Sequence, residues 1–96
     1  MVDTPGVKTK VAVLGAGSWG TTFSKILADG GADVTIWARR PELAREISQS
    51  KRNSDYLPGI NLPRGLWSSS HLPEVLEGLI TAGEDAFVCG ELAAAE

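Results

Sequence analysis

The sequence predicts an α/β fold with a parallel sheet, and three observations support this. A short apolar run at residues 10–14 leads into a glycine-rich turn at 15–20, helical periodicity begins directly after the turn, and a β-branched run follows at 33–38. Parallel strands buried on both faces form nearly continuous apolar runs, and helices connect them. The order strand, helix, strand is the repeating unit of such a fold.

The first predicted strand is the valine-rich segment 10–14, which stops at Gly15. The first predicted helix begins near Ser18 and ends at the glycine pair 30–31. Its buried face is expected to carry four apolar side chains at helical spacing: Trp19, Phe23, Ile26 and Leu27.

The second predicted strand covers residues 33–38, and a second helix begins at Pro41, which suits a first helical turn. Its apolar face would carry Leu43, Ala44 and Ile47. Residues 51–66 are rich in proline and glycine and predict an irregular connection. A third helix is expected from about Ser70. Its apolar positions are Leu72, Val75, Leu76, Leu79 and Ile80.

The carboxyl-terminal part carries weaker signals. Ala86–Cys89 predicts a weak third strand, and residues 91–96 predict a short, frayed helix. The whole order is β-α-β-α followed by a weaker α-β, which predicts a partial Rossmann-type parallel sheet without a substrate domain. We expect residues 1–9 to be an extension and 10–96 an incomplete nucleotide-binding domain with a divergent tail at 67–96.

The composition is that of one small soluble domain, with 96 residues, 43% of them hydrophobic and 22% charged. A net charge of -3 provides no basic field for nucleic acid. Cys89 is the single cysteine, so neither an intramolecular disulfide nor a C-x-x-C metal site is expected. No apolar run suits a signal peptide or membrane span, which favours a cytoplasmic protein.

The turn at 15–20 matches the pattern G-x-G-x-x-G of dinucleotide-binding folds. Gly15 permits a tight turn, Gly17 lets the backbone approach a pyrophosphate, and Gly20 lets helix and strand pack closely. The helix dipole and the first amides then face the phosphates. The sequence therefore predicts cofactor contacts along the whole turn: Gly15, Ala16, Gly17, Ser18, Trp19 and Gly20.

The end of the second strand indicates which cofactor is preferred. A site for NAD expects an acidic residue there, to bind the ribose 2′-hydroxyl. Asp33 lies at the opposite end of that strand, and Arg39 and Arg40 stand at the expected place. Guanidinium groups pair with a 2′-phosphate, so NADP is favoured over NAD. The alternative is that these arginines are solvated or pair with Glu42 and Glu46.

Each tryptophan and the single histidine could be either a site residue or a structural one. Trp19 either covers a bound nucleotide or packs in the core, and both remain open. Trp37 and Trp67 are expected to be packing residues. His71 lies in a polar run without catalytic partners at recognisable spacing, so it is expected on the surface.

Residues 11–22, 34–41 and 53–60 together resemble the start of bacterial NAD(P)-dependent glycerol-3-phosphate dehydrogenases. The most specific pieces are the turn G-A-G-S-W-G-T and the later motif N-x-x-Y-L-P-G. The resemblance covers about residues 10–66. It implies cofactor contacts at Ser18, Trp19, Arg39 and Arg40, and also at Tyr56, whose ring offers an apolar face with a polar tip.

The resemblance also implies an activity, which is reversible hydride transfer between NAD(P)H and dihydroxyacetone phosphate to give sn-glycerol 3-phosphate for phospholipid synthesis. The tail departs from the family, which continues into a lysine-bearing segment and a helical substrate domain. The lysines of this chain are Lys8, Lys10, Lys25 and Lys51. All belong to the nucleotide-binding half, so we assign no catalytic residue and expect substrate to bind only if the missing domain is supplied.

Three readings of the function stay open at this point. The chain is the amino-terminal part of such a dehydrogenase, a non-catalytic nucleotide-binding module, or a fragment of another Rossmann reductase. We hypothesise that it is a truncated or frame-disrupted product, which sequencing of its locus would decide. Exposed sheet edges could drive self-association, so a homo-oligomer is possible in principle.

Overall fold

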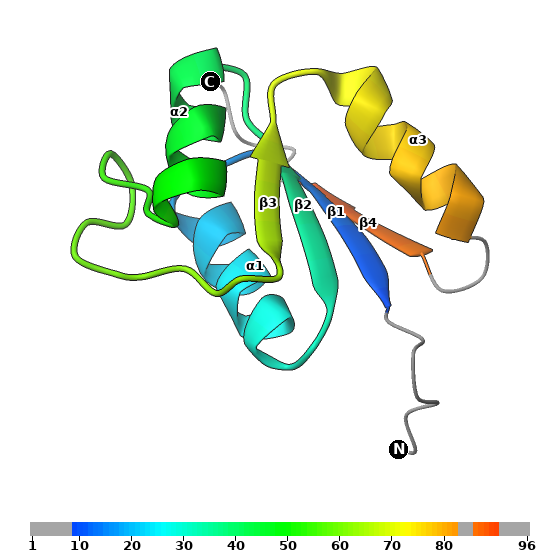
Figure 1. The fold of residues 1–96 in the computed structure, drawn as a ribbon, viewed down its shortest axis with the longest axis horizontal. Helices are drawn as coiled ribbons and strands as arrows, with labels where there is room; N and C mark the ends of the chain where they lie inside the picture. Colours follow the sequence, from blue (N-terminus) through cyan, green and yellow to red (C-terminus); the bar gives the residue numbers. More distant parts are fainter. Residues whose placement is uncertain (1–8, 83–85, 91–96) are drawn as a thin grey trace.

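The computed structural model describes residues 9–82 and 86–90, which form a four-stranded, wholly parallel sheet with helices on both faces (Figure 1). The strands are β1 (Lys10–Leu14), β2 (Asp33–Trp37), β3 (Leu66–Ser69) and β4 (Ala86–Gly90). Their spatial order is β3-β2-β1-β4, the order of the first four strands of a Rossmann sheet. The predicted fold class is confirmed.

Three helices cover the sheet. Helices α1 (Ser18–Asp29) and α2 (Pro41–Arg45) lie on one face, and α2 continues into one turn of π-helix, η1 (Glu46–Ser50). Helix α3 (Leu72–Ala82) lies on the opposite face (Figure 1). Strands β1, β2 and β3 follow one another towards one edge of the sheet, and β4 then lies on the other side of β1. With right-handed crossovers, this change of direction places α3 on the opposite face of the sheet from α1 and α2.

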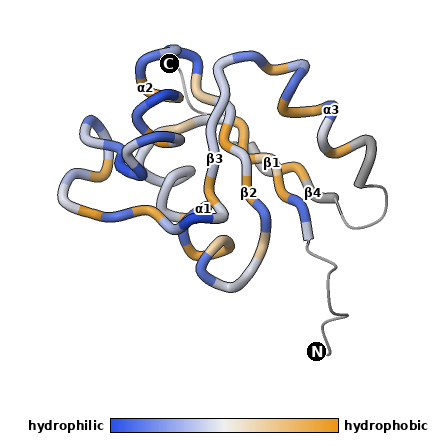
Figure 2. Tube along the Cα trace, viewed as in Figure 1, coloured by the Kyte–Doolittle hydropathy of each residue, from blue (hydrophilic) through white to orange (hydrophobic). Residues whose placement is uncertain are grey.

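The core lies between the sheet and the helices, and Figure 2 shows apolar residues concentrated along the middle of β1 and β2. The buried strand side chains include Val11, Ala12, Val13, Val34, Ile36 and Leu66. The predicted apolar face of the second helix is confirmed, because Leu43, Ala44 and Ile47 are all buried. Full burial of one such aliphatic side chain contributes about 1.5–3 kcal/mol.

The buried face of α1 differs from the prediction. Its buried residues are small: Gly20, Thr21, Ser24 and Ala28. Trp19 is 56% exposed and Ile26 62% exposed, so two of the four predicted core positions are wrong, while Leu27 packs against the core. Small side chains allow the helix to lie close to the sheet, and the Ser24 hydroxyl donates to the Gly20 carbonyl at 2.7 Å. The spacing of large apolar residues therefore predicted the buried face incorrectly at Trp19 and Ile26.

Strand β3 was not predicted, because it lies at the end of the expected irregular connection and contains only four residues, two of them serine. It is an edge strand whose outer side is covered by η1 and the residue after it. The Ser48 hydroxyl accepts from the Ser68 N–H at 2.8 Å and donates to the Ser68 carbonyl at 2.9 Å. The Lys51 ammonium donates to the Leu66 carbonyl at 2.7 Å. Covered edge groups are a poorer template for strand pairing between molecules.

The last two elements follow the prediction. Helix α3 begins after His71, whose carbonyl accepts the N–H groups of Glu74 and Val75, and Val75 is buried. Strand β4 pairs with β1 over its full length. Residues 1–8 of the predicted extension at 1–9, and the predicted helix at 91–96, lie outside the described residues. In the part of the chain that is described, no helix combines the length and apolarity needed to cross a membrane.

Candidate functional site

The glycine turn lies at the carboxyl end of the sheet and joins β1 to α1. Gly15 has a φ of 128°, a conformation that L side chains rarely adopt, and its N–H donates to the Trp37 carbonyl at 3.0 Å. Gly17 is the N-cap of α1, and its carbonyl accepts the Thr21 N–H at 3.0 Å. The turn therefore directs the amino end of α1 towards the space above the strand ends.

This helix end has the electrostatic character of an anion site. Among residues 9–82 and 86–90, no side chain caps the amino end of α1, whose N-cap is Gly17. The first turn of α1 also contains no acidic residue. A helix amino terminus carries a partial positive charge and directs N–H groups outwards. The geometry suits a phosphate group placed against Gly17 and Ser18.

Residues 53–57, here named the strap, cross the glycine turn and are fixed to it by a buried asparagine. The Asn53 side chain is fully buried. Its amide nitrogen donates to the Ala16 carbonyl at 3.0 Å and to the Thr21 hydroxyl at 2.8 Å. Its carbonyl oxygen accepts the Tyr56 N–H at 3.2 Å. Asn53 thus holds both the turn and the strap, a role that sequence reasoning missed although the residue belongs to the N-x-x-Y-L-P-G motif.

A second tie joins the strap to α1 directly. The Ser18 hydroxyl donates to the Tyr56 carbonyl at 2.8 Å. Ser18 and Tyr56 are both predicted cofactor contacts, separated by 38 positions, and the structure brings them together. The Tyr56 side chain is exposed beside the amino end of α1.

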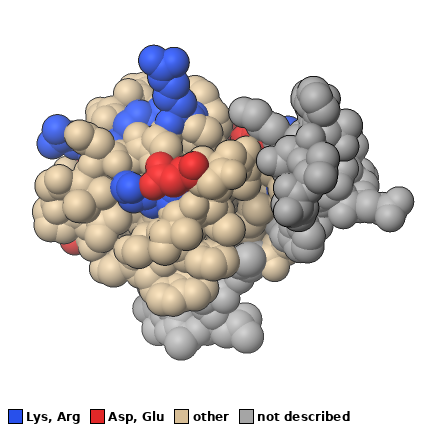
Figure 3. Space-filling view, turned by 90° about the horizontal axis from the view of Figure 1, so that it is seen from below, with Lys and Arg blue, Asp and Glu red and all other residues tan. Residues whose placement is uncertain are grey.

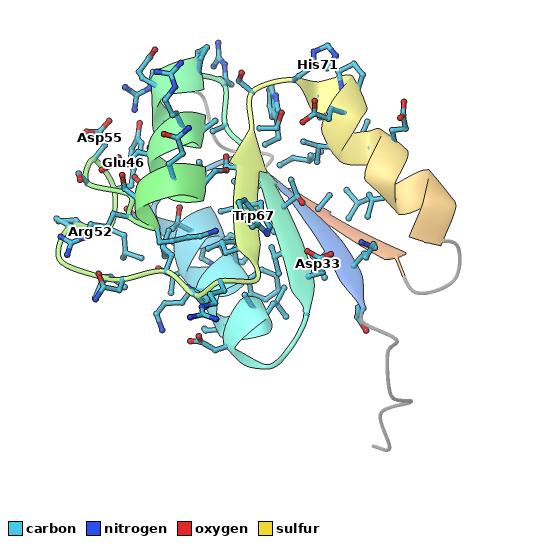
Figure 4. All side chains as sticks on the ribbon, in the orientation of Figure 1. Asp33, Glu46, Arg52, Asp55, Trp67 and His71 are labelled. Carbon is cyan, nitrogen blue, oxygen red and sulfur yellow. The ribbon has the colours of Figure 1, made fainter. Side chains whose placement is uncertain are left out.

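The two arginines after β2 have different surroundings. Arg40 donates from Nη2 to the Asp55 carboxylate at 2.6 Å, and this hydrogen bond raises the pKa of the Arg40 guanidinium above its usual value. Arg39 is exposed, and its side chain has no partner among the residues placed by the structure. The alternative that Arg40 pairs with Glu42 or Glu46 is wrong, because its partner is Asp55. Glu46 accepts hydrogen bonds from Ser54. Figure 4 shows Glu46 and Asp55 on the same side of the molecule.

Trp19 lies on the surface beside the turn, stacked on Phe23 with ring centroids 5.1 Å apart. The core alternative for Trp19 is therefore wrong, because its ring is exposed in the first turn of α1. The packing expectation holds for Trp37, which is half-buried and donates from its indole to the Ser70 carbonyl at 3.2 Å.

Trp67 contradicts the packing expectation, because it is 50% exposed. Its ring is covered by the Lys51 ammonium, 3.6 Å from the ring centroid, and partial burial lowers the pKa of that ammonium. His71 is exposed, as expected. Neither residue lies at the glycine turn (Figure 4).

Asp33 occupies the opposite end of the sheet from the turn, as predicted. Its carboxylate pairs with the Lys10 ammonium at 2.9 Å, and the two residues are paired in the β1–β2 register. Figure 3 views this lower end of the molecule, where most of the surface is uncharged and basic side chains lie beside acidic ones. Within the described ranges, no group of three or more His, Cys, Asp or Glu side chains is placed to hold a metal ion.

Comparison with known proteins identifies the family. Residues 10–81 match the family model described as NAD-dependent glycerol-3-phosphate dehydrogenase N-terminus. The chain belongs to this family. The match extends beyond residue 66, where the resemblance was expected to end, and includes all of α3 except its last residue.

Individual relatives agree with the family. The chain is 73% identical over 66 residues to a glycerol-3-phosphate dehydrogenase (NAD(P)+) of Leifsonia xyli, which covers 69% of this chain and 18% of the relative. It is 57% identical over 68 residues to the enzyme of the same name from Corynebacterium glutamicum, covering 71% of this chain and 20% of that protein. The chain therefore spans about a fifth of the length of the curated relatives it matches.

Solved structures confirm the fold of this amino-terminal part. The crystal structure of glycerol-3-phosphate dehydrogenase from Coxiella burnetii superimposes with a TM-score of 0.68 and 37% identity, over 74% of this chain and 22% of that one. The Rossmann-type glycerol-3-phosphate dehydrogenase domain is thus established, and the roles of single residues in it are matters for proposal.

Proposed function

We propose that this chain binds NADP or NAD at the carboxyl end of its sheet, with NADP favoured, as the cofactor domain of a glycerol-3-phosphate dehydrogenase. One observation carries the proposal: the uncapped amino end of α1 follows a positive-φ glycine turn, and an arginine pair stands at the end of the neighbouring strand β2. This juxtaposition offers a pyrophosphate site and a 2′-phosphate site side by side.

The residues fit such a cofactor. Gly15 adopts a conformation in which a side chain would be strained, and Gly17 leaves the helix end open. The pyrophosphate would lie against the N–H groups from Gly17 to Gly20. Trp19 and Tyr56 are exposed aromatic residues near that helix end, suited to cover the bound nucleotide.

The adenosine ribose would lie beyond the end of β2. Arg39 is the guanidinium there without a partner inside the described ranges, so it is free to pair with a 2′-phosphate. Arg40 lies next to it in sequence, already engaged by Asp55. We infer that Arg39 supplies most of the preference for NADP.

When bound, the cofactor supplies or accepts the hydride. The reaction that we propose for the complete enzyme is hydride exchange between NAD(P)H and dihydroxyacetone phosphate, giving sn-glycerol 3-phosphate. The 96-residue chain is not expected to catalyse it. Of its lysines, Lys10 lies at the amino end of the sheet, Lys25 pairs with Asp29, and Lys51 lies against β3, all away from the glycine turn. No described lysine is therefore placed to protonate a carbonyl oxygen there.

Titration of the purified chain with NADPH and NADH tests the proposal, with circular dichroism to show that the protein is folded. We expect saturable binding of both, tighter for NADPH, and no turnover of dihydroxyacetone phosphate. A folded chain that binds neither cofactor would refute cofactor binding. Tighter binding of NADH would refute the assignment of Arg39, and turnover would refute the predicted inactivity. The cytoplasmic location and homo-oligomer expected from the sequence stay predictions.

A further inference from the structure

The ion pair between Arg40 and Asp55 places a carboxylate at the proposed 2′-phosphate site. The two side chains meet at 2.6 Å, and each is about half exposed, at 47% for Arg40 and 54% for Asp55. Asp55 comes from the strap, 15 positions after Arg40. The strap is anchored over the glycine turn by Asn53 and by the hydrogen bond from Ser18 to Tyr56. The position of Asp55 is therefore set by the same segment that borders the pyrophosphate site.

We propose that Asp55 sets the relative affinity of the site for NADP and NAD. This inference rests on the proposed cofactor site. Its carboxylate occupies the Arg40 fork that a 2′-phosphate would otherwise engage. It also adds a negative charge close to that phosphate, and like charges oppose each other. Both effects weaken NADP and leave the pyrophosphate contacts unchanged.

The same carboxylate suits the unphosphorylated cofactor. Sites selective for NAD carry an acidic residue at the end of β2 that accepts a hydrogen bond from the ribose 2′-hydroxyl. In this chain that position holds arginine, and the acidic group arrives from the strap instead. The site then contains both the acceptor that NAD needs, on Asp55, and the cation that NADP needs, on Arg39. Such a pairing produces a site that accepts both cofactors.

The test is Asp55→Asn in the full 96-residue chain, with the dissociation constants of NADPH and NADH measured by calorimetry. Asparagine keeps the shape of the side chain and removes its charge. We expect NADPH to bind about fivefold more tightly and NADH to bind no better, so that the ratio of the two constants changes by about fivefold or more. Because the pair is exposed, the change should shrink as salt is raised from about 0.1 M to about 1 M.

Asp29→Asn is the matched control. Asp29 forms an exposed ion pair of the same length with Lys25, 2.6 Å, at the far end of α1. This variant should leave the ratio unchanged. Binding of 2′,5′-ADP and of 5′-AMP provides a second readout confined to the adenosine end, and only the 2′-phosphorylated ligand should gain from Asp55→Asn.

The outcomes separate the two proposals. An unchanged ratio in Asp55→Asn, with both cofactors still bound, overturns the role of Asp55 and leaves the proposed function standing. Equal weakening of both cofactors shows that Asp55 only holds the strap in place, which also overturns it. A wild-type chain that is folded and binds neither cofactor overturns the proposed function and this inference with it.

Discussion

At the carboxyl end of the parallel sheet Arg40 pairs with Asp55 at 2.6 Å, and at the amino end Lys10 pairs with Asp33 at 2.9 Å. Each pair joins a basic side chain to an aspartate, but the surroundings of the two pairs differ. The first pair stands beside an open helix amino terminus and a strap tied down by a buried asparagine. The second links two neighbouring strands and stands at the end of the sheet opposite the glycine turn.

Both ends carry an ion pair, so charge alone does not distinguish the end at which we propose the cofactor to bind. What distinguishes the carboxyl end is backbone geometry. Parallel strands all end there, and the helix after β1 begins there, so N–H groups and loop side chains converge on one space. Matched substitutions at the two ends test whether only the carboxyl end binds the cofactor.

The largest effect is expected at the glycine turn. Gly15→Ala forces a side chain into a φ of 128°, which costs about 1–3 kcal/mol of unfolding free energy and displaces the turn. Loss of two phosphate hydrogen bonds would weaken NADPH about a hundredfold. Gly31→Ala is the control at the amino end, because Gly31 has a φ of 103° and open space around its Cα. Gly31→Ala should lose stability in urea unfolding but bind NADPH as the wild type does. Equal affinity in both variants would contradict the assignment of the turn.

The next effect concerns the anchor of the strap. Asn53→Ala removes the amide donor shared by the Ala16 carbonyl and the Thr21 hydroxyl and leaves these two groups only their mutual hydrogen bond at 3.3 Å, so we expect a loss of about 2 kcal/mol in urea unfolding. Both cofactors should weaken together, by about tenfold. The exposed Asn61 provides a control, and Asn61→Ala should change neither stability nor affinity. A stable Asn53→Ala chain with unchanged affinity would show that the strap does not support the turn.

A selective effect is expected from the free arginine. Arg39→Ala removes a charged partner of the 2′-phosphate, which should weaken NADPH about tenfold and leave NADH nearly unchanged. Arg64→Ala removes an exposed arginine near the amino end of the sheet and should have no such effect. Fluorescence titration of both variants with both cofactors measures this. If Arg39→Ala weakens NADH as strongly as NADPH, Arg39 does not recognise the 2′-phosphate.

The smallest effect is expected at the amino-end ion pair. Asp33→Asn breaks a partly exposed pair with Lys10, whose contribution should be below about 1 kcal/mol and should fall at high salt. Cofactor affinity should stay at the wild-type value. A change of affinity in this variant would mean that the amino end of the sheet also affects cofactor binding.

Local patterns in the sequence predicted much of the fold. Strand β1, the glycine turn and the buried face of α2 each depend on residues that are neighbours in the chain, so periodicity and turn chemistry reveal them. Strand β3 and the inner face of α1 were missed for a shared reason. Half of β3 is serine, and the inner face of α1 consists of small residues such as Ser24, so neither carries a regular pattern of large apolar side chains.

The candidate cofactor site follows from sequence patterns where it depends on the turn, and less well where distant segments meet. Motif spacing located residues 15–20 and the arginine pair, and family resemblance added Tyr56. The partners of Arg40 and Asn53 are 15 and 37 positions away, at Asp55 and Ala16, and a hydrogen bond over that separation leaves no periodic signal. The exposure of Trp19 also required the structure, because its spacing to Phe23 fits a buried stripe as well as an exposed stack.

The most direct test of the central claim is to map NADPH on the isotope-labelled 96-residue chain by amide chemical-shift changes. Cofactor binding at the carboxyl end of the sheet should concentrate the changes at the glycine turn (15–20), at Arg39 and Arg40, and in the strap (53–57). Changes concentrated instead around Gly31, Asp33 and Arg64, or none at all in a spectrum of a folded protein, would contradict it.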